Sequence, residues 1–283
     1  MTSTLIAKQD NRIKKIKFSL LMSVYYKSNS IYLEQALKSV WDYQQLKPSQ
    51  IVLIQDGPVS LEIEQVLLKW KKKLGTILTL FKYDTNKGLA LALNKGLTLC
   101  KYELVARMDD DDISLPGRFY QQVNYLLCNP NVSVLGTQVE ERDQSLKNIL
   151  SYRKVPLNDD DIKLFSKTRS PINHPSVMYK KSVILSVGGY PKLYPEDWPL
   201  WGLLITNKVT FANLNEILVT MRSQDAVSNR RGFKFLIGEI RGLLFLLRCR
   251  HLNFIEFTKC LLIRLFVRLA PVNFKRFLYK HFR

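Results

Sequence analysis

The chain has 283 residues, 46% of them hydrophobic, and a formal net charge of +19 at pH 7. This length and apolar content can bury a sizeable core as one large domain, which excludes an intrinsically disordered protein. The charge is uneven, because residues 230–283 carry 13 Lys and Arg against 2 Asp and Glu, a net +11 that leaves +8 for the first 229 residues. Such an excess is typical of proteins that bind nucleic acid or anionic membranes.

The cysteines and the N-terminus indicate the compartment. Cys100, Cys128, Cys249 and Cys260 form no CxxC pair and have no histidine cluster nearby, so we expect reduced thiols. Residues 1–17 lack the apolar core of a signal peptide, and no run reaches about 18 uninterrupted apolar residues. These features predict a cytoplasmic protein that does not span a membrane.

The first 108 residues alternate between strand-like and helix-like segments. Apolar runs predict strands at 18–24, 51–54, 76–83 and 103–108, and helical spacing of apolar residues predicts helices at 31–43, 61–74 and 89–99. This order predicts an α/β fold with a mostly parallel, doubly wound sheet flanked by helices. In such a sheet, ligands bind beyond the carboxyl ends of the strands.

Four consecutive aspartates follow the fourth predicted strand directly. If that strand continues into them, alternation places Asp109 and Asp111 on one face and Asp110 and Asp112 on the other. Two carboxylates on one face can bind a hard divalent ion. Taken by itself, the run is also compatible with a solvated acidic turn before a helix.

Other polar and aromatic residues also follow predicted strands. Tyr25 comes after the first strand, Asp56 after the second, and Lys87 after the third. An aromatic ring, a carboxylate, a cation and an acid pair at neighbouring strand ends suit a base, a ribose and a diphosphate. The sequence contains neither GxGxxG after the first strand nor GxxxxGK[ST], so neither glycine-rich loop holds the phosphates. These residues therefore predict a nucleotide pocket in which a metal balances the phosphate charge.

Six short motifs between residues 18 and 222 together resemble family 2 glycosyltransferases of the GT-A fold, most closely bacterial enzymes of O-antigen and capsule assembly. They are LMSVY at 21–25, QDG at 55–57, NKGL at 86–89, ARMDDDDIS at 106–114, NHPS at 173–176 and EDW at 196–198. Each motif is weak alone, and their shared order makes the resemblance specific. Gln55 departs from the pattern, because relatives often carry a second aspartate there.

The resemblance implies roles for the donor-binding residues. Asp56 would hydrogen-bond the uracil of a UDP-sugar, Tyr25 would lie against the base, and Lys87 would approach the base or the diphosphate. Asp109 and Asp111 would be the outer positions of a DxD motif. Asp109 would face the ribose and the metal shell, and Asp111 would coordinate the Mn²⁺ or Mg²⁺ cofactor.

The acceptor side is predicted around Glu196 and Asp197, in the first turn of a predicted helix. Successive helical residues point about 100° apart, so the two acids cannot face one hydroxyl. The resemblance assigns the catalytic base to Asp197 and acceptor or supporting contacts to Glu196. Trp198 and Trp201 are candidates for stacking on a sugar, although core packing is the alternative for at least one of them. His174 either approaches the diphosphate or acceptor, or only orders a loop.

The resemblance predicts an inverting, metal-dependent hexosyltransferase of O-antigen or other surface polysaccharide synthesis. The donor would be a UDP-sugar, with galactose favoured and glucose next, and the acceptor a glycan on polyprenyl diphosphate, joined by a beta linkage. We expect an N-terminal extension at 1–17 and a catalytic domain at 18–229. The catalytic domain divides into a nucleotide-sugar half, 18–115, and an acceptor half, 116–229.

Residues 230–283 are predicted to form a basic tail of two amphipathic helices. The expected apolar positions are Phe233, Leu236, Ile237, Ile240, Leu244 and Leu247 in the first, and Phe254, Phe257, Leu261, Leu265 and Leu269 in the second. One interpretation is an anchor on the anionic inner face of the cytoplasmic membrane, and the other is packing on the catalytic domain. We favour the anchor, because the expected acceptor is lipid-linked.

Two other classes of protein remain as alternatives. A nucleotidyltransferase also uses paired acids and a parallel sheet, but it needs a glycine-rich, basic loop after the first strand, where residues 23–27 read SVYYK. A protein that binds nucleic acid through the tail leaves the four aspartates unexplained. We therefore expect no nucleic-acid partner.

Overall fold

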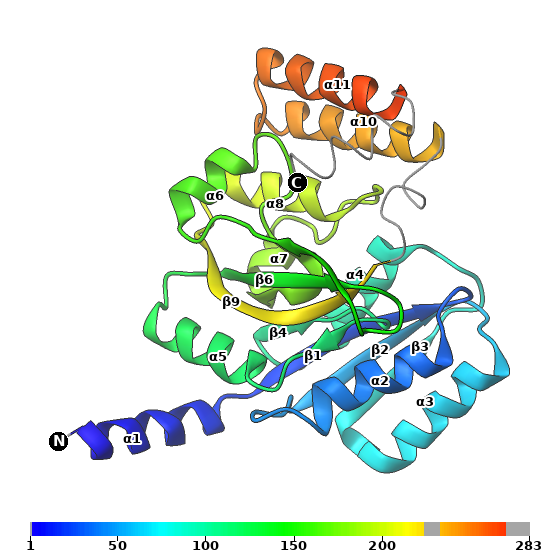
Figure 1. Ribbon diagram of the computed structural model, residues 1–283, viewed down its shortest axis with the longest axis vertical. Coiled ribbons are helices and arrows are strands. Elements are labelled where there is room, and N and C mark those ends of the chain that lie inside the picture. The colour runs from blue at the N-terminus through cyan, green and yellow to red at the C-terminus, as the bar shows by residue number, and fades with distance from the viewer. Residues whose placement is uncertain (1, 224–232, 270–283) are drawn as a thin grey trace.

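The computed structural model describes residues 2–223 and 233–269 (Figure 1). Within them, nine strands form one sheet in the order β3-β2-β1-β4-β8-β6-β9-β5, with β7 paired to β6. The strands are β1 (Phe18–Tyr25), β2 (Gln50–Asp56), β3 (Leu78–Lys82), β4 (Leu104–Arg107), β5 (Ile113–Ser114), β6 (Val134–Arg142), β7 (Ile149–Arg153), β8 (Met178–Lys180) and β9 (Phe211–Arg222).

Helices cover both faces of this sheet. They are α1 (Thr2–Lys15), α2 (Ser30–Trp41), α3 (Leu61–Leu74), α4 (Leu89–Leu99), α5 (Arg118–Cys128), α6 (Asp159–Phe165), α7 (Lys181–Ser186), α8 (Asp197–Thr206), α10 (Phe233–Arg248) and α11 (Phe254–Leu269). Short 3-10 turns lie at Gly75–Ile77 and His174–Ser176.

Alternation along β1 divides the core into two layers. Leu20 and Met22 face the layer formed with α2, α3 and α5, whereas Leu21 faces the layer formed with α4 and α8. Both faces of β1 are therefore apolar, which explains the nearly continuous apolar run in the sequence. The predicted helices at 61–74 and 89–99 are confirmed with the same bounds.

The sheet is parallel in its first half and mixed in its second. β3, β2, β1 and β4 run parallel to one another. β8 pairs antiparallel with β4, and β6 antiparallel with β8. The predicted α/β class, with helices flanking one sheet, is confirmed, but the description "mostly parallel" holds only for the half that contains β1 to β4. An apolar run predicts a strand, but it carries no information about the neighbour or direction that the strand will take.

The N-terminal extension forms a helix, α1, which the sequence analysis did not predict. Ile13 is fully buried, and Gln9 Nε2 donates a hydrogen bond to Asn124 Oδ1 of α5 over 2.9 Å. The last turn and a half of α1 is therefore attached to the sheet-covering helix α5.

The tail forms a helical hairpin, α10 and α11, that packs against α8 (Figure 1). Trp198 of α8 is buried in a small apolar cluster with Leu243 and Leu246 of α10 and Cys260 of α11. At the turn of the hairpin, the buried imidazole of His251 lies 3.0 Å from Ser166 Oγ. Part of the tail therefore packs on the rest of the chain.

The apolar faces of the tail differ from the prediction. In α10, Leu243 and Leu246 are buried, while the predicted inward residue Leu244 is exposed. In α11, the predicted inward residue Phe254 is 72% exposed. Both helices have more apolar positions than one face holds, so spacing alone did not fix which face is covered. The described structure does not include residues 224–232 and 270–283. It also does not include the side chains of Phe233 and Leu269, which were predicted to face inward.

The outer side of α11 exposes a second apolar face. Its exposed apolar residues are Phe254, Ile255, Leu262, Ile263 and Phe266, with relative exposures between 58% and 72%. We call these five residues the outer face of α11. In the part of the chain that the structure describes, no helix combines the length and the hydropathy needed to cross a bilayer.

Candidate active site

Asp56, at the end of β2, fixes the loop that begins α4. Its Oδ1 accepts a hydrogen bond from the backbone N–H of Lys87 over 2.7 Å, and its Oδ2 accepts one from Gly88 over 2.9 Å. The next residue, Gly57, has φ +89°, and a Cβ there would lie 2.6 Å from the Asn86 backbone nitrogen. The QDG and NKG motifs are therefore one assembly, in which Asp56 is almost fully buried and the Lys87 side chain is exposed.

Tyr25 lies at the end of β1, beside the aspartate run. Its side chain is 40% exposed, and the ring of Tyr26 meets it edge-on with 5.4 Å between centroids. Partial burial, and then the negative charge of Asp110 and Asp111, raise the pKa of the Tyr25 hydroxyl. The structure thus brings the ends of the first and fourth strands together, as the sequence predicts.

Arg107 is a site residue that the sequence analysis missed. It is the last residue of β4 and is only 2% exposed. Its guanidinium binds both carboxylate oxygens of Asp109, with Nη1 2.7 Å from Oδ2 and a closer contact between Nη2 and Oδ1. Such a bidentate ion pair fixes the orientation of the carboxylate. The available signal was an arginine at the end of an otherwise apolar strand, directly before the acids.

Asp112 is bonded to the end of β9. Its Oδ1 accepts a hydrogen bond from the Arg222 backbone N–H over 3.0 Å, and Arg222 Nε donates to the Asp111 carbonyl oxygen over 2.7 Å. These bonds attach the aspartate run to the end of β9. Arg222 is therefore a second supporting cation that the sequence analysis did not select.

The carboxylates of the aspartate run form a site with a deficit of positive charge. Burial, and then the neighbouring Asp111, raise the pKa of Asp110 to about 7, and burial and then Asp109 raise the pKa of Asp111 to about 6. The buried Oδ2 atoms of Asp110 and Asp112 have no hydrogen-bond partner among the described residues. Clustered, desolvated carboxylates of this kind are stabilised by a bound cation.

The donor set fits a divalent ion that is shared with a substrate. In residues 2–223 and 233–269, no three metal-ligating side chains converge. Mg²⁺ is commonly held by one or two carboxylates together with substrate phosphates and water, so a complete protein cage is not required. Because both oxygens of Asp109 are bound by Arg107, Asp111 is the more available ligand of the predicted pair.

Glu196 points into the protein and joins His174. Its Oε1 lies 3.4 Å from His174 Nδ1, and His174 Nε2 lies 3.2 Å from the Tyr190 hydroxyl. Burial, and then Arg107, hold the pKa of His174 well below its usual range, so the imidazole is neutral. Burial, and then Asp197, raise the pKa of Glu196 to about 7. The structure therefore places His174 in a buried network behind the acid pair.

Asp197 points in a different direction from Glu196. It is the first residue of α8 and is half-buried, and its Oδ2 accepts a hydrogen bond from Ser170 Oγ over 2.9 Å. The predicted divergence of the two acids is confirmed, since one bonds inward to His174 and the other bonds Ser170. The sequence analysis did not select Ser170, which lies in a loop without a motif.

The predicted sugar contacts of the two tryptophans are wrong. Trp201 is fully buried in the core beside Phe211. Trp198 is 6% exposed; its indole N–H donates to the Ser166 carbonyl oxygen, and the guanidinium of Arg264 covers its ring at 4.5 Å. α8 is apolar on nearly every side, so helical position alone did not reveal which rings are covered.

A parallel half-sheet with an aspartate run at its strand ends, facing an acid pair at the start of α8, defines a glycosyltransferase of the GT-A fold. A model of the family described as Glycosyl transferase family 2 matches residues 19–185. The chain belongs to this family. This assignment decides among the three classes of protein that the sequence analysis considered.

Named relatives support the assignment over nearly the whole chain. The chain is 35% identical to UDP-Gal:alpha-D-GlcNAc-diphosphoundecaprenol beta-1,3-galactosyltransferase of Escherichia coli, over 93% of this chain and 95% of that protein. It is 38% identical to amylovoran biosynthesis glycosyltransferase AmsE of Erwinia amylovora, over 93% of this chain and 98% of that protein. The expected link to bacterial enzymes of surface polysaccharide assembly is therefore confirmed by the relatives.

A solved structure shares the fold at lower sequence identity. Mannosyltransferase PcManGT from Pyrobaculum calidifontis, in complex with GDP-Man and Mn²⁺, superposes with a TM-score of 0.61 at 14% identity. The match covers 94% of this chain and 77% of that one. It extends into the C-terminal part of the chain, beyond the residues that the family model matches.

Proposed function

We propose that the protein is a metal-dependent, inverting hexosyltransferase that moves galactose, with glucose as second choice, from a UDP-sugar to a lipid-linked glycan. The observation that supports this most directly is the position of Arg107 between the two halves of the site. Arg107 binds Asp109 of the aspartate run, and its charge also acts on Glu196 of the acid pair. The donor and acceptor ends thus share one buried cation.

In this proposal the first half of the chain holds the donor. Tyr25 stacks against the base, Lys87 approaches the base or diphosphate, and Asp109 faces the ribose. Asp56 binds the uracil with lone pairs that its two backbone partners leave free, because a carboxylate offers about four acceptor sites. When bound at Asp111 and Asp109, Mn²⁺ or Mg²⁺ supplies positive charge for the departing diphosphate.

Asp197 is the proposed catalytic base. Its carboxylate takes the proton of the acceptor hydroxyl, whose oxygen attacks the sugar C1 from the side opposite the diphosphate. The bond from C1 to the diphosphate breaks, and the product of an alpha-linked donor is a beta linkage. The hydrogen bond from Ser170 holds the Asp197 carboxylate in position. Glu196 and His174 form its supporting network on the inner side.

The acceptor is proposed from the relatives and from the tail. The Escherichia coli relative is named for transfer to GlcNAc-diphosphoundecaprenol, a sugar on a lipid diphosphate. In this chain, the outer face of α11 presents exposed apolar side chains beside exposed Lys259. An apolar helix face flanked by basic residues is typical of helices that lie at an anionic membrane surface. We place the protein there, at the cytoplasmic side.

The experiment is a transfer assay with the purified protein, Mn²⁺, a panel of UDP-sugars and a synthetic GlcNAc-diphospholipid, with products analysed by mass spectrometry and by NMR for the anomeric linkage. We expect UDP-galactose to give one beta-linked product. Asp197→Asn keeps the size of the side chain but removes the base, so kcat should fall by roughly 10²- to 10⁴-fold. Calorimetry should show unchanged UDP binding.

Two outcomes would contradict the proposal. Full activity in EDTA would exclude the metal, and an alpha-linked product would exclude the inverting mechanism. If Asp197→Asn lost UDP affinity in step with activity, Asp197 would belong to the donor site instead.

A further inference from the structure

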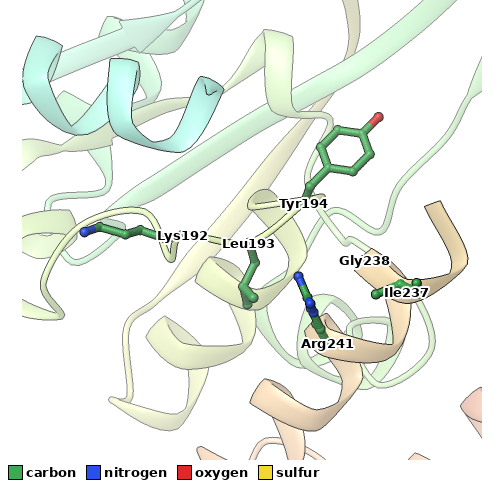
Figure 2. A pocket seen from close by; sticks show the side chains of 6 residues that line it. All are labelled: Lys192, Leu193, Tyr194, Ile237, Gly238 and Arg241. Carbon is green, nitrogen blue, oxygen red and sulfur yellow. The ribbon is translucent and has the colours of Figure 1, made fainter. Parts of the chain in front are cut away.

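A cavity of about 510 Å³ lies between the loop before α8 and the first turns of α10 (Figure 2). Lys192, Leu193 and Tyr194 line it from the loop, and Ile237, Gly238 and Arg241 line it from α10. Its volume falls in the range of pockets that hold small ligands. None of its lining residues comes from the nucleotide-sugar half of the chain, so it is separate from the donor site.

The walls of this cavity are held together by a close backbone contact. A Cβ on Gly238 would lie 2.1 Å from the Tyr194 carbonyl oxygen, so only glycine lets α10 approach the loop this closely. The ring of Phe235 meets the ring of Tyr194 edge-on, with 5.6 Å between centroids. The first turns of α10 therefore define one side of the cavity in a fixed position.

The cavity is linked to the proposed base by a short stretch of chain. Tyr194 precedes Asp197 by three residues, which limits the separation of their Cα atoms to roughly 10 Å. A sugar residue with its linkages spans a length of the same order as this upper limit. A molecule whose hydroxyl meets Asp197 can therefore reach into the cavity with the group attached to the other end of that sugar.

The lining combines positive charge with apolar surface. Lys192 and Arg241 are exposed, and among the described residues neither forms an ion pair with a carboxylate. Figure 2 shows the Arg241 guanidinium pointing from α10 toward Leu193 and Tyr194, whereas Lys192 extends along the loop away from it. Leu193 and Ile237 supply apolar walls. A guanidinium matches phosphate oxygens, and apolar walls suit a hydrocarbon attached to the phosphate.

We propose that this cavity binds the diphosphate of the lipid-linked acceptor, with Arg241 as the principal cation and Lys192 as a second, weaker one. The inference rests on the proposed function, because it assumes that the acceptor sugar meets Asp197. It assigns the helical hairpin a part in acceptor recognition. The lipid chain then leaves the cavity along the hairpin, whose outer face on α11 is apolar.

The kinetic test compares Arg241→Gln with Arg248→Gln, which removes the same charge from an exposed position in the last turn of α10. Two acceptors are used: GlcNAc on a lipid diphosphate, and GlcNAc on an uncharged lipid. We expect Arg241→Gln to raise KM for the diphosphate acceptor about tenfold or more, because a charged hydrogen bond is lost. Both kcat and the KM of the uncharged acceptor should be unchanged. Lys192→Gln should have a smaller effect of the same kind, and Arg248→Gln none.

A binding test works without turnover. With excess UDP and Mn²⁺ filling the donor site, farnesyl diphosphate, farnesol and inorganic diphosphate are titrated by calorimetry. We expect farnesyl diphosphate to bind more tightly than the other two, and its binding to weaken in Arg241→Gln but not in Arg248→Gln. Tight binding of inorganic diphosphate alone would point to a free phosphate ligand and would overturn the lipid part of the proposal.

The two proposals fail in different ways. If the wild-type protein transfers sugar to both acceptors with equal KM, or if Arg241→Gln and Arg248→Gln behave alike, the cavity assignment is wrong while the proposed function stands. If no acceptor is glycosylated but Arg241→Gln weakens farnesyl diphosphate binding, the cavity binds a lipid diphosphate that is not a glycosyl acceptor, and the proposed function is wrong.

Discussion

At the scale of single residues, the main feature of the site is that it contains more carboxylates than positive groups to balance them. Arg107 and Arg222 are the positive groups bonded to the aspartate run within the described residues. Both oxygens of Asp109 are engaged by Arg107. Asp110 and Asp111 retain raised pKa values because burial and neighbouring carboxylates are not fully balanced. A bound divalent ion would supply the missing charge, and the individual acids should respond differently to substitution.

We predict that Asp111→Asn nearly abolishes transfer, by roughly a hundredfold or more, while Asp110→Asn is mild. Asp111 is the proposed metal ligand, whereas Asp110 occupies the variable middle position of the motif. Transfer rates at several Mn²⁺ concentrations would check this, with circular dichroism as the control for folding. Equal loss in both variants would contradict the assignment of the metal ligand.

Glu196 gives a prediction about pH and stability. Its pKa in the folded protein is about 7, raised from 4.5 by burial and then by Asp197, with Asp109 acting in the same direction and Arg107 opposing it. The neutral imidazole of His174 lies beside the Glu196 carboxyl group, with 3.4 Å between Nδ1 and Oε1. Because the folded state prefers the protonated acid, this group lowers the free energy of unfolding as pH rises from about 4.5 to about 7.

Replacing Glu196 by Gln should remove that pH-dependent cost. The gain in the free energy of unfolding over the wild-type protein should be near zero below pH 4.5 and should grow to at most about 3 kcal/mol above pH 7, since one pKa unit is about 1.4 kcal/mol. Melting temperatures of both proteins from pH 4 to 8 would measure it. A difference that stays flat, or that shrinks as pH rises, would show that the carboxyl group is charged at little cost.

The roles predicted from the sequence differ most from the structure at residues whose role depends on whether the side chain is buried. The positions of Tyr25, Asp56 and the aspartate run at neighbouring strand ends follow from the order of strands and helices, and were predicted. The Asp56 bonds to the backbone of residues 87 and 88 were not, because they depend on the path of a loop. The sugar contact predicted for Trp198 was wrong for a similar reason. The side chains that cover this ring come from residues more than 40 positions later in the chain.

At the scale of secondary structure, the prediction was correct where the sequence pattern was compatible with only one arrangement. The helix at 89–99 is preceded by Gly88 and ends at Leu99, before the next strand begins at Leu104, and its bounds were predicted. The mixed part of the sheet could not be predicted in direction, because β8 and β6 join through pairings between distant residues. The hairpin helices carry apolar residues on two sides, so sequence spacing could not decide between packing and membrane binding. The structure shows packing on one side and an exposed apolar face on the other.

We predict that the two sides of the hairpin respond differently to substitution. The triple variant Ile255→Gln, Leu262→Gln, Ile263→Gln changes only residues exposed by more than half. It should keep its melting temperature and lose roughly tenfold or more in binding to anionic vesicles, because partial insertion of apolar side chains is lost. Vesicle co-sedimentation and thermal melting measure both effects.

The matched control is Leu243→Ala in α10. Leu243 is fully buried against α8, so the substitution should lower the free energy of unfolding by about 2–5 kcal/mol. Its vesicle binding should be unchanged at a temperature where it remains folded. If the triple variant bound vesicles as well as the wild-type protein, the outer face of α11 would not be a membrane-binding surface.

At the scale of the whole molecule, the positive charge is unevenly distributed along the chain. The tail carries +11 of the total +19, and in Figure 1 the hairpin lies at the end of the molecule opposite to α1. The proposed acceptor cavity is formed partly by this hairpin. A membrane under the hairpin would therefore place a lipid-linked acceptor beside the acid pair and leave the donor site facing the aqueous phase.

This arrangement predicts that added salt reduces transfer to a lipid-linked acceptor more than transfer to a soluble one. Each basic residue near an anionic surface contributes about 1 kcal/mol, and the screening length falls from about 10 Å at 0.1 M salt to about 3 Å at 1 M. Raising KCl from 0.1 to 0.5 M should therefore reduce transfer to a lipid-linked acceptor in anionic vesicles several-fold. Transfer to a short, uncharged acceptor in solution should change little, because binding of the donor diphosphate is partly shielded within the site.

Vesicles of neutral phosphatidylcholine are the control, and with them the salt effect should be small. An equal fall in both acceptors would instead place the salt effect on the donor, and the net charge of the tail would then have no part in bringing the enzyme to its substrate.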